Sequence, residues 1–442
     1  MKKITALLLA LLLLLLTGCG SGDSAYDETY DEMNPTPPPT ENSSEATELT
    51  GELVLTSAYP KEYNVLGFYG ELFQKEHPEV NVVYNMPETV DDAIAFKDKL
   101  LIEFYSDAGG DLLDMQAFDT HKLSHNGLLV DFYYLMGKDS SFNMDDYYTN
   151  VWEATEIEDK LFTLTTHFSY DLVQLNLSAV ESIGFEYALG DSLNYAELVD
   201  LYTEAINTGA LSKSASLFAP YFQTAYIDGL EMPDRFIDVN KLTGNFSSSE
   251  FIEYYNFTRQ DDLFNDTHYL NDDVLTENSF ATLPMGQNLS GNIAGLVAVD
   301  SAATNKTLPL KLDASNGNKV FRRGCSLSIS ALSNAGDLPW EFIKFVIEEK
   351  NYNSTSDLEG NSYYYLNAFD INRNNCINTV SFVASTEIAE YIDRLNNDLD
   401  TVAAEFTFNE FIKEIEGLSP EITPEELAKQ LQEKADLYFS EF

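Results

Sequence analysis

Cysteine is scarce in this chain. Only three of its 442 residues are cysteines, at positions 19, 325 and 376. A small exported fold held together by disulfides needs a denser cysteine framework, so that class of protein is excluded. Only Cys325 and Cys376 remain as a candidate pair once Cys19 is assigned to the modification argued below. The sequence leaves open whether these two form a bridge or stay as buried thiols.

Basic residues are also few. Lysine and arginine together number 25 against 73 aspartates and glutamates, which gives a formal charge of −48. Phosphates would be repelled by such a chain, so nucleic acid is not an expected partner. The simplest role of this charge is a solvated acidic surface that keeps an exported protein soluble.

Several catalytic and metal-binding motifs are absent. The chain has no phosphate-loop spacing, no GxSxG, no HExxH and no EF-hand loop. His121 and His125 are four residues apart on an expected helix, but no third histidine is near, so we expect two exposed histidines rather than a metal site. With 73 acidic residues, carboxylate pairs are too common to signal a glycosidase. We therefore expect no catalytic residues, no metal and no cofactor.

The one long apolar run is at the start of the chain. Leu7 to Leu16 follows Lys2 and Lys3 and is too short to span a bilayer, but it suits the apolar region of a signal peptide. The sequence Leu16-Thr17-Gly18-Cys19 resembles the lipobox of bacterial lipoproteins. That resemblance implies a signal peptide over residues 1–18 and a lipid on Cys19 that holds the protein at the extracellular face of the membrane.

A change of composition marks residues 19–50. This segment is acidic, contains the run Pro35-Thr36-Pro37-Pro38-Pro39 and has almost no aliphatic side chains. It cannot bury enough surface to fold, so we expect a disordered tether.

Beyond the tether, strand and helix patterns alternate. The expected strands are 52–57, 80–84 and 111–115, and the expected helical faces between them lie at 65–73 and 93–104. This order predicts a parallel α/β sheet, whose ligands bind at the carboxyl ends of the strands. The loops to consider are therefore Ala58 to Glu62 and Gln116 to Thr120.

The stretch from Lys160 to Leu177 is the main organising element. Apolar side chains fall at the even positions up to Leu172 and at odd positions from Val173 onward. Period-two alternation predicts a strand with one buried face, and a one-residue flip predicts a bend or a change of sheet. We interpret it as a crossing between two lobes, with a return along Arg323 to Ser330.

Several stretches of the sequence, in their order along the chain, resemble those of a known protein family. These stretches are FYGELFQKEHPEVNVV, GGDLLDMQAF, NGLLVDF, KLFTLTTHFSYDLVQLN, LSISALSN followed by PWEFIKFVIEE, and TPEELAKQLQEKADLYFSE. They occur as in bacterial extracellular solute-binding proteins of the sugar-binding class of ABC transporters, family 1. The resemblance implies a two-lobed, periplasmic-binding-protein-like α/β fold with crossing hinge strands. The expected lobes are 51–165 with about 330–395, and about 166–329 with 396–442.

The resemblance also implies a function. The protein would be a monomeric, non-enzymatic binder that captures a small solute, a sugar or oligosaccharide, and delivers it to an ABC permease. Family members that bind sugars commonly place tryptophans at the ligand, whereas this chain has only Trp152 and Trp340, and both fit packing roles. A peptide, polyamine or other solute on the same fold, and a surface glycan-degrading enzyme, therefore remain as alternatives.

A sugar site needs flat apolar faces and groups that bond hydroxyls. Aromatic or acidic residues at the expected strand ends and crossings supply the candidates, and Arg323 adjoins the return strand. The candidate ligand-binding residues are Tyr59, Asp119, Phe168, Tyr170, Tyr221, Tyr226 and Arg323. Each has a plainer alternative: core packing for the aromatic residues, a helix cap for Asp119 and a surface ion pair for Arg323.

Overall fold

The structure is a computed structural model, and the second of the chain's two units, Thr47–Phe442, is compact. All described residues belong to the second unit. They are 49–105, 109–170, 172–186, 192–213, 215–218, 236–238, 243–258, 279–282, 307–313, 318–348, 369–383, 386–402 and 422–440. The predicted signal peptide, Cys19 and nearly all of the tether lie outside these ranges. No helix in the described part is both long and apolar enough to cross a membrane.

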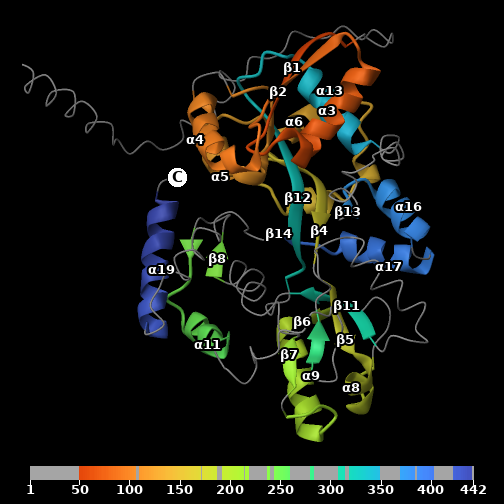
Figure 1. The fold of residues 1–442 in the computed structure, drawn as a ribbon, viewed down its shortest axis with the longest axis vertical. Coiled ribbons are helices and arrows are strands. Elements are labelled where there is room, and N and C mark those ends of the chain that lie inside the picture. Colours follow the sequence, from red (N-terminus) through yellow and green to blue (C-terminus); the bar gives the residue numbers. More distant parts are fainter. Residues whose placement is uncertain are drawn as a thin grey trace, which may run out of the picture. The chain divides into compact units, whose positions relative to one another are not determined.

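The largest sheet of the described residues has seven strands (Figure 1). Its order is β13-β4-β12-β3-β1-β2, and β14 pairs with β12. The strands are β1 (Gly51–Thr56), β2 (Val80–Asn85), β3 (Leu112–Asp114), β4 (Leu164–Ser169), β12 (Val320–Ile329), β13 (Phe369–Asp370) and β14 (Thr401–Val402). β1 runs parallel to both β2 and β3. The predicted parallel sheet is therefore confirmed for the first three strands.

Helices connect these strands and cover the sheet. The helices of this part are α3 (Val65–Glu76), α4 (Ala93–Phe104), α5 (Thr120–His125), α6 (Phe132–Lys138), α7 (Thr149–Glu153), α13 (Leu338–Ile347), α16 (Arg373–Val383) and α17 (Thr386–Asn397). Asn64 caps α3 by accepting a 2.9 Å hydrogen bond from the Gly67 amide. On α3, the ring of Phe73 lies 5.2 Å from those of Phe342 and Phe345 on α13. This contact belongs to the main hydrophobic core.

A separate five-stranded sheet has the order β6-β11-β5-β10-β7. Its strands are β5 (Leu172–Asn176), β6 (Ser192–Asn194), β7 (Ser216–Phe218), β10 (Ser279–Thr282) and β11 (Thr307–Asp313), with helices α8 (Leu177–Ser182) and α9 (Tyr195–Thr208). Asn194 and Glu197 form a capping box at the start of α9. The described residues of this sheet come from segments far apart in the chain.

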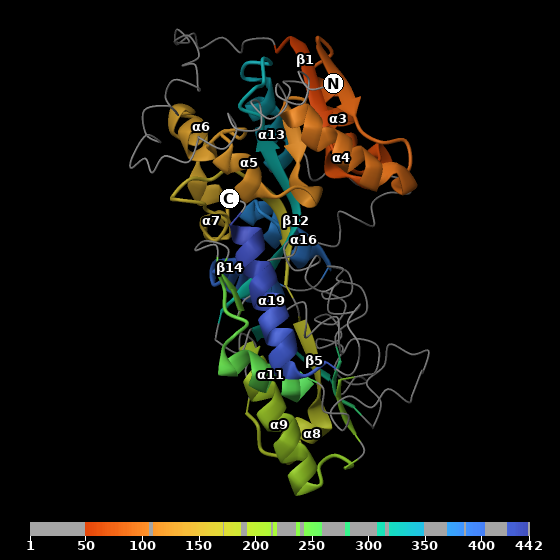
Figure 2. The same ribbon diagram turned by 90° about the vertical axis from the view of Figure 1, so that its left-hand side faces the viewer.

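A third, smaller group contains the C-terminal helix. It consists of β8 (Ile237–Asp238), β9 (Thr243–Gly244), α11 (Ser249–Thr258) and α19 (Pro424–Phe439). α19 lies beside α11 in Figures 1 and 2 and contacts it. Gln432 ties α19 to the strand pair: its amide donates to the Gly244 carbonyl (2.9 Å) and its oxygen accepts from the Phe246 amide (2.9 Å).

The chain changes sheet where the alternation flips. β4 belongs to the seven-stranded sheet and β5 to the five-stranded one, and the two are separated by Tyr170 and Asp171. The return is made between β11 and β12, since β12 pairs with β3 and β4. Both predicted crossings are confirmed as changes of sheet. The exact lobe boundaries stay a prediction.

One part of the crossing prediction is wrong. The polar positions Thr163, Thr165 and His167 were expected on an open face of the strand, yet all three are buried. Hydroxyl pairs make this possible: Thr163 lies 3.0 Å from Ser328 and Thr165 lies 3.2 Å from Ser326, so the buried hydroxyls are hydrogen-bonded across the sheet. His167 stays neutral because burial lowers its pKa to about 4.

Candidate functional site

The carboxyl ends of β1 and β3 meet at one edge of the seven-stranded sheet. These strands are parallel neighbours, with Thr56 opposite Leu113, so Ser57 and Asp114 come next to each other at the edge. The Ser57 hydroxyl donates a 2.8 Å hydrogen bond to Asp114 Oδ2. The backbone amide of Tyr59 donates to the same Ser57 oxygen at 3.0 Å. The loop that carries Tyr59 is thus fastened to the end of β3.

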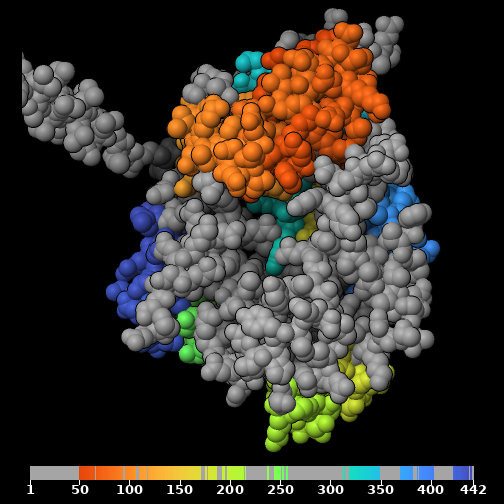
Figure 3. All heavy atoms as spheres, viewed as in Figure 1, coloured from red at the N-terminus to blue at the C-terminus, as the bar shows by residue number. Residues whose placement is uncertain are grey.

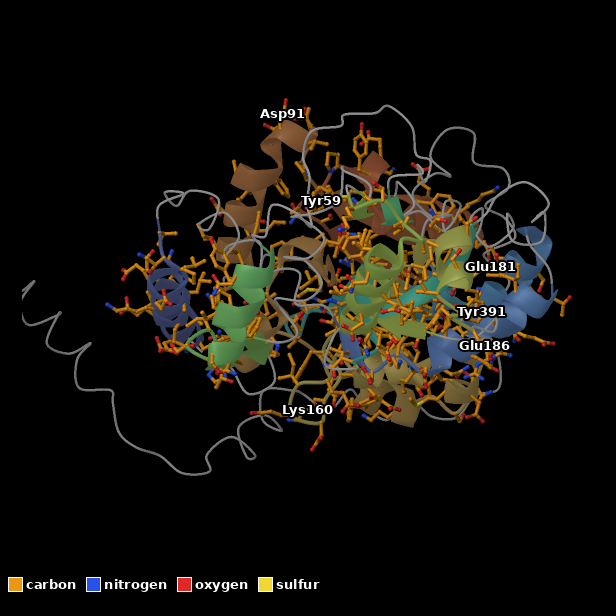
Figure 4. All side chains as sticks on the ribbon, turned by 90° about the horizontal axis from the view of Figure 1, so that it is seen from below. Tyr59, Asp91, Lys160, Glu181, Glu186 and Tyr391 are labelled. Carbon is orange, nitrogen blue, oxygen red and sulfur yellow. The ribbon has the colours of Figure 1, made fainter. Side chains whose placement is uncertain are left out.

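Asp114 is the buried centre of this edge. The residue is 3% exposed, and its Oδ1 accepts a 3.1 Å hydrogen bond from the backbone amide of Gln116. Burial raises the pKa of Asp114 to about 6, although the hydrogen bonds from Ser57 and Gln116 act in the opposite direction. Tyr59, labelled in Figure 4, is half-buried, and burial and the nearby Asp114 charge both raise its pKa.

Gln116 links this edge to a crossing strand. Its side chain is exposed, and its Nε2 donates a 2.7 Å hydrogen bond to the carbonyl of Gly324 on β12. The pairing of β12 with β4 shifts register between Arg323 and Cys325, which makes Gly324 part of an irregularity of the bulge kind. Glycine inside a strand often marks such an irregularity. Atoms of β12 are visible at the surface in Figure 3, drawn in teal beside the orange residues.

Two charged residues, Asp119 and Arg323, lie close to His121. Asp119 is the N-cap of α5, and its carboxylate accepts a 3.2 Å hydrogen bond from the backbone amide of Lys122, so the helix-cap alternative describes what its side chain does here. The pKa of His121 is lowered by burial and by the charge of Arg323, while Asp119 opposes both effects. Asp119 and Arg323 are therefore each close enough to act on His121 electrostatically, and all three residues are partly exposed.

The predicted crossing aromatics are buried. Phe168 is 0% exposed and packs edge-on against Tyr148 and Phe321, at centroid distances of 5.9 and 6.1 Å. Tyr170 is 2% exposed and stacks on Phe369 at 4.8 Å. Neither side chain is exposed to solvent in this structure. Both therefore have the core-packing role that was the alternative to ligand binding. Their role at a ligand stays a prediction.

The remaining predictions concern two tyrosines, two tryptophans and metal binding. Tyr221 and Tyr226 lie outside the described residues. Trp152 and Trp340 both have the packing roles expected of them: the Trp152 indole donates to the Thr165 carbonyl at 2.9 Å, and the Trp340 indole donates to Asp139 at 3.0 Å. Within the described ranges, no three histidines, cysteines or carboxylates gather in a way that could hold a metal.

Sequence reasoning did not single out Ser57, Asp114 or Gln116. The available signal was an acidic residue at the end of a buried run, Leu112-Leu113-Asp114. The expected strand 111–115 and the observed β3 (Leu112–Asp114) both contain Asp114, so its place in the strand gave no sign of a functional role. Its partner Ser57 is 57 residues away in the sequence, and the strand pattern alone does not show that pairing.

Comparison with known proteins gives matches to solved structures only. No family model matches the chain, and no curated protein matches it. The sugar-binding protein MalE from Xanthomonas citri gives a TM-score of 0.61 at 14% identity, covering 88% of this chain and 98% of that one. An extracellular solute-binding protein of family 1 from Alicyclobacillus acidocaldarius gives 0.56 at 12% identity, covering 89% and 99%.

A third match is an ABC substrate-binding protein from Listeria monocytogenes in complex with cycloalternan. Its TM-score is 0.52 at 14% identity, and the match covers 88% of this chain and 99% of that one. All three likenesses extend over nearly the whole of the known structures, at identities too low to carry residue roles. The resemblance expected from the sequence is confirmed at the level of fold. This chain has the α/β fold of the periplasmic-binding-protein-like extracellular solute-binding proteins.

Proposed function

We propose that this protein is an extracellular solute-binding protein that captures a sugar or oligosaccharide and delivers it to an ABC permease. The observation that carries the proposal is the position of Tyr59 and Gln116. Both lie at the carboxyl ends of parallel strands, and Gln116 contacts the crossing strand β12. Ligands of open α/β sheets bind at this edge. The solved structures of similar fold support the same proposal, since they are solute- and sugar-binding proteins.

The side chains at this edge suit a neutral, hydroxyl-rich solute. The half-buried ring of Tyr59 offers a flat face to a sugar ring, and the exposed amide of Gln116 bonds hydroxyls as donor and acceptor. Solute that touches both lobes only in the closed state would shift the balance toward closure by its differential affinity.

A cationic solute is less well supported. Asp114 is too deeply buried to meet a ligand directly, and Asp119 already accepts a hydrogen bond from the Lys122 amide. A polyamine would need carboxylates that are not already engaged in this way. These contacts favour a sugar over a polyamine.

The proposal includes attachment to the membrane. A lipid on Cys19 and a tether over residues 19–50 would hold the folded unit, as a monomer, at the extracellular face of the cell membrane near its permease. The support is the sequence Leu16-Thr17-Gly18-Cys19 and the acidic, proline-containing composition that follows it.

A thermal-shift screen tests the proposed function. The panel contains maltose, maltotriose, a cyclic glucan, a tripeptide and spermidine, and each hit is confirmed by calorimetry and checked for turnover by chromatography. We expect a sugar to raise Tm and to be recovered intact. Stabilisation by spermidine or the tripeptide alone, or release of smaller sugars, would contradict the proposal.

Matched tyrosine variants then locate the site. Tyr59→Ala should weaken binding of the hit, whereas Tyr63→Ala, four residues away and 54% exposed, should leave it unchanged. Equal affinities of both variants for the hit would place the solute elsewhere.

A further inference from the structure

Asp114 joins three parts of the candidate site through hydrogen bonds. Oδ2 accepts from Ser57, whose oxygen in turn accepts from the Tyr59 amide, and Oδ1 accepts from the Gln116 amide. Gln116 continues the connection to Gly324 on β12. One buried carboxylate therefore orders the loop after β1, the loop after β3 and the contact with the crossing strand.

No basic side chain in the described part of the chain forms an ion pair or hydrogen bond with Asp114. Its carboxylate is stabilised by one hydroxyl and one backbone amide. The titratable groups that face it are Tyr59 from the loop after β1 and Cys325 from β12. Both of their pKa values are raised by burial, so both groups stay neutral while Asp114 titrates. A buried carboxylate without a cation is costly to ionise, so a proton can be taken up readily.

We propose that Asp114 is a proton-responsive positioning residue, which orders Tyr59 and Gln116 for solute binding when it is ionised and loosens them when it is protonated. The proposal rests on the proposed function in so far as Tyr59 and Gln116 meet the solute. It makes binding at this edge dependent on the pH outside the cell.

Proton uptake reverses one hydrogen bond. The ionised carboxylate accepts from the Ser57 hydroxyl, and the Ser57 oxygen is then free to accept from the Tyr59 amide. A protonated Oδ2 must instead donate to Ser57, whose oxygen then accepts twice while its own hydrogen points elsewhere. The hydrogen bond from Tyr59 competes with the new one and weakens. The hydrogen bond from the backbone amide of Gln116 to Oδ1 also loses its charge-assisted character.

Selective 15N labelling of tyrosine tests this without any solute. The amide signal of Tyr59, assigned with Tyr59→Phe, is followed from about pH 5 to pH 7.5, a range that spans a midpoint near 6. We expect this signal to titrate with that midpoint in the parent protein and to stay still in Asp114→Asn. The Tyr63 amide, which bonds the Pro60 carbonyl at 2.9 Å, is the internal control and should not move with it.

Ser57→Ala provides a second variant in case Asp114→Asn folds poorly. It removes the hydroxyl between Asp114 and Tyr59, so the Tyr59 signal should lose its response to pH. A Tyr59 signal that does not titrate in the parent, or that titrates equally in either variant, overturns the proposal.

The binding arm uses maltotriose as the probe. Parent affinity should fall about fivefold as Asp114 is protonated, the scale of one lost hydrogen bond. Asp114→Asn should bind with one affinity at every pH, equal to that of the protonated parent. If maltotriose and the rest of the panel fail to bind, the proposed function fails, while the tyrosine signals still decide the role of Asp114. A parent affinity that is independent of pH contradicts the control of binding by Asp114.

Discussion

Gln116 and Gly324 are 208 residues apart in the chain, and a 2.7 Å hydrogen bond joins the side-chain amide of the first to the carbonyl of the second. The bond connects the loop after β3 to the strand on which the chain returns from the five-stranded sheet. Gly324 lies where β12 changes register against β4. The candidate site is therefore in direct contact with the element that links the two sheets.

Replacing Gln116 by alanine should weaken solute binding about fivefold, because it removes an amide that bonds hydroxyls and steadies β12. The free energy of unfolding should change by less than about 1 kcal/mol, since the side chain is exposed. Calorimetry with the solute found in the screen and urea unfolding measure the two effects.

Gln430→Ala is the matched control for this experiment. Gln430 is a partly exposed glutamine, and its side-chain amide bonds Glu426 within α19 at 3.2 Å. It should leave the affinity unchanged. Equal losses of affinity in Gln116→Ala and Gln430→Ala would show that Gln116 has no particular role.

Phe168 and Tyr59 should respond to alanine in opposite ways. Phe168→Ala should lower the free energy of unfolding by about 3–5 kcal/mol, because the ring is fully buried among aromatic neighbours. Tyr59→Ala should change it by no more than about 1 kcal/mol, but should cost about 1–3 kcal/mol of binding free energy if its ring stacks on the solute. Chemical unfolding and calorimetry on both variants separate the two roles. A stable Phe168→Ala protein with lost affinity would instead make Phe168 a ligand residue.

Much of the fold was predictable because its signals are local. The period-two alternation and its flip at Val173 located the change of sheet between β4 and β5, and alternating patterns located β1, β2 and β3. A pattern of polarity does not show what covers a strand, however. The buried Thr165 was misplaced because its partner Ser326 is 161 residues away.

The site was less predictable for the same reason. Asp119 could be identified as a residue at a strand end, but Asp114 becomes conspicuous only when Ser57 is brought beside it by the pairing of β1 with β3. Phe168 and Tyr170 were selected for their position at the crossing. Aromatic residues there fill the core just as readily as they face a ligand, and the alternation of the strand does not distinguish the two.

The two helical histidines should have no metal-binding role. His121→Ala with His125→Ala should leave both metal content and solute affinity unchanged, because His125 is exposed and no third ligand of the described residues joins them. Elemental analysis of the purified parent and double variant measures this directly. Loss of one equivalent of metal in the double variant would show that these histidines bind it.

The stability of the protein should reveal the burial of Asp114. Its pKa is 3.8 in the unfolded chain and about 6 when folded, so the folded state binds the proton more tightly. This contribution is therefore favourable at low pH and is lost as pH rises through 6. Between about pH 5 and 7.5 the parent should lose about 1 kcal/mol that Asp114→Asn does not lose.

Urea unfolding at both pH values measures this difference. The other acidic groups are common to both proteins and cancel in the comparison. A difference between the two proteins that stays constant across this range would mean that Asp114 keeps an ordinary pKa.

Cys19 should be the first residue of the mature protein and should carry lipid. Mass spectrometry of the native N-terminus should show a diacylglycerol-sized addition on Cys19, and Cys19→Ala should move the protein from the membrane fraction to the medium. The expectation has a physical basis, since acyl chains contribute about 0.8 kcal/mol per buried methylene group and two chains give stable anchoring. The tether of about 30 residues would then allow the folded unit a reach of about 30 Å from the membrane. An unmodified N-terminus at another residue would contradict this anchoring.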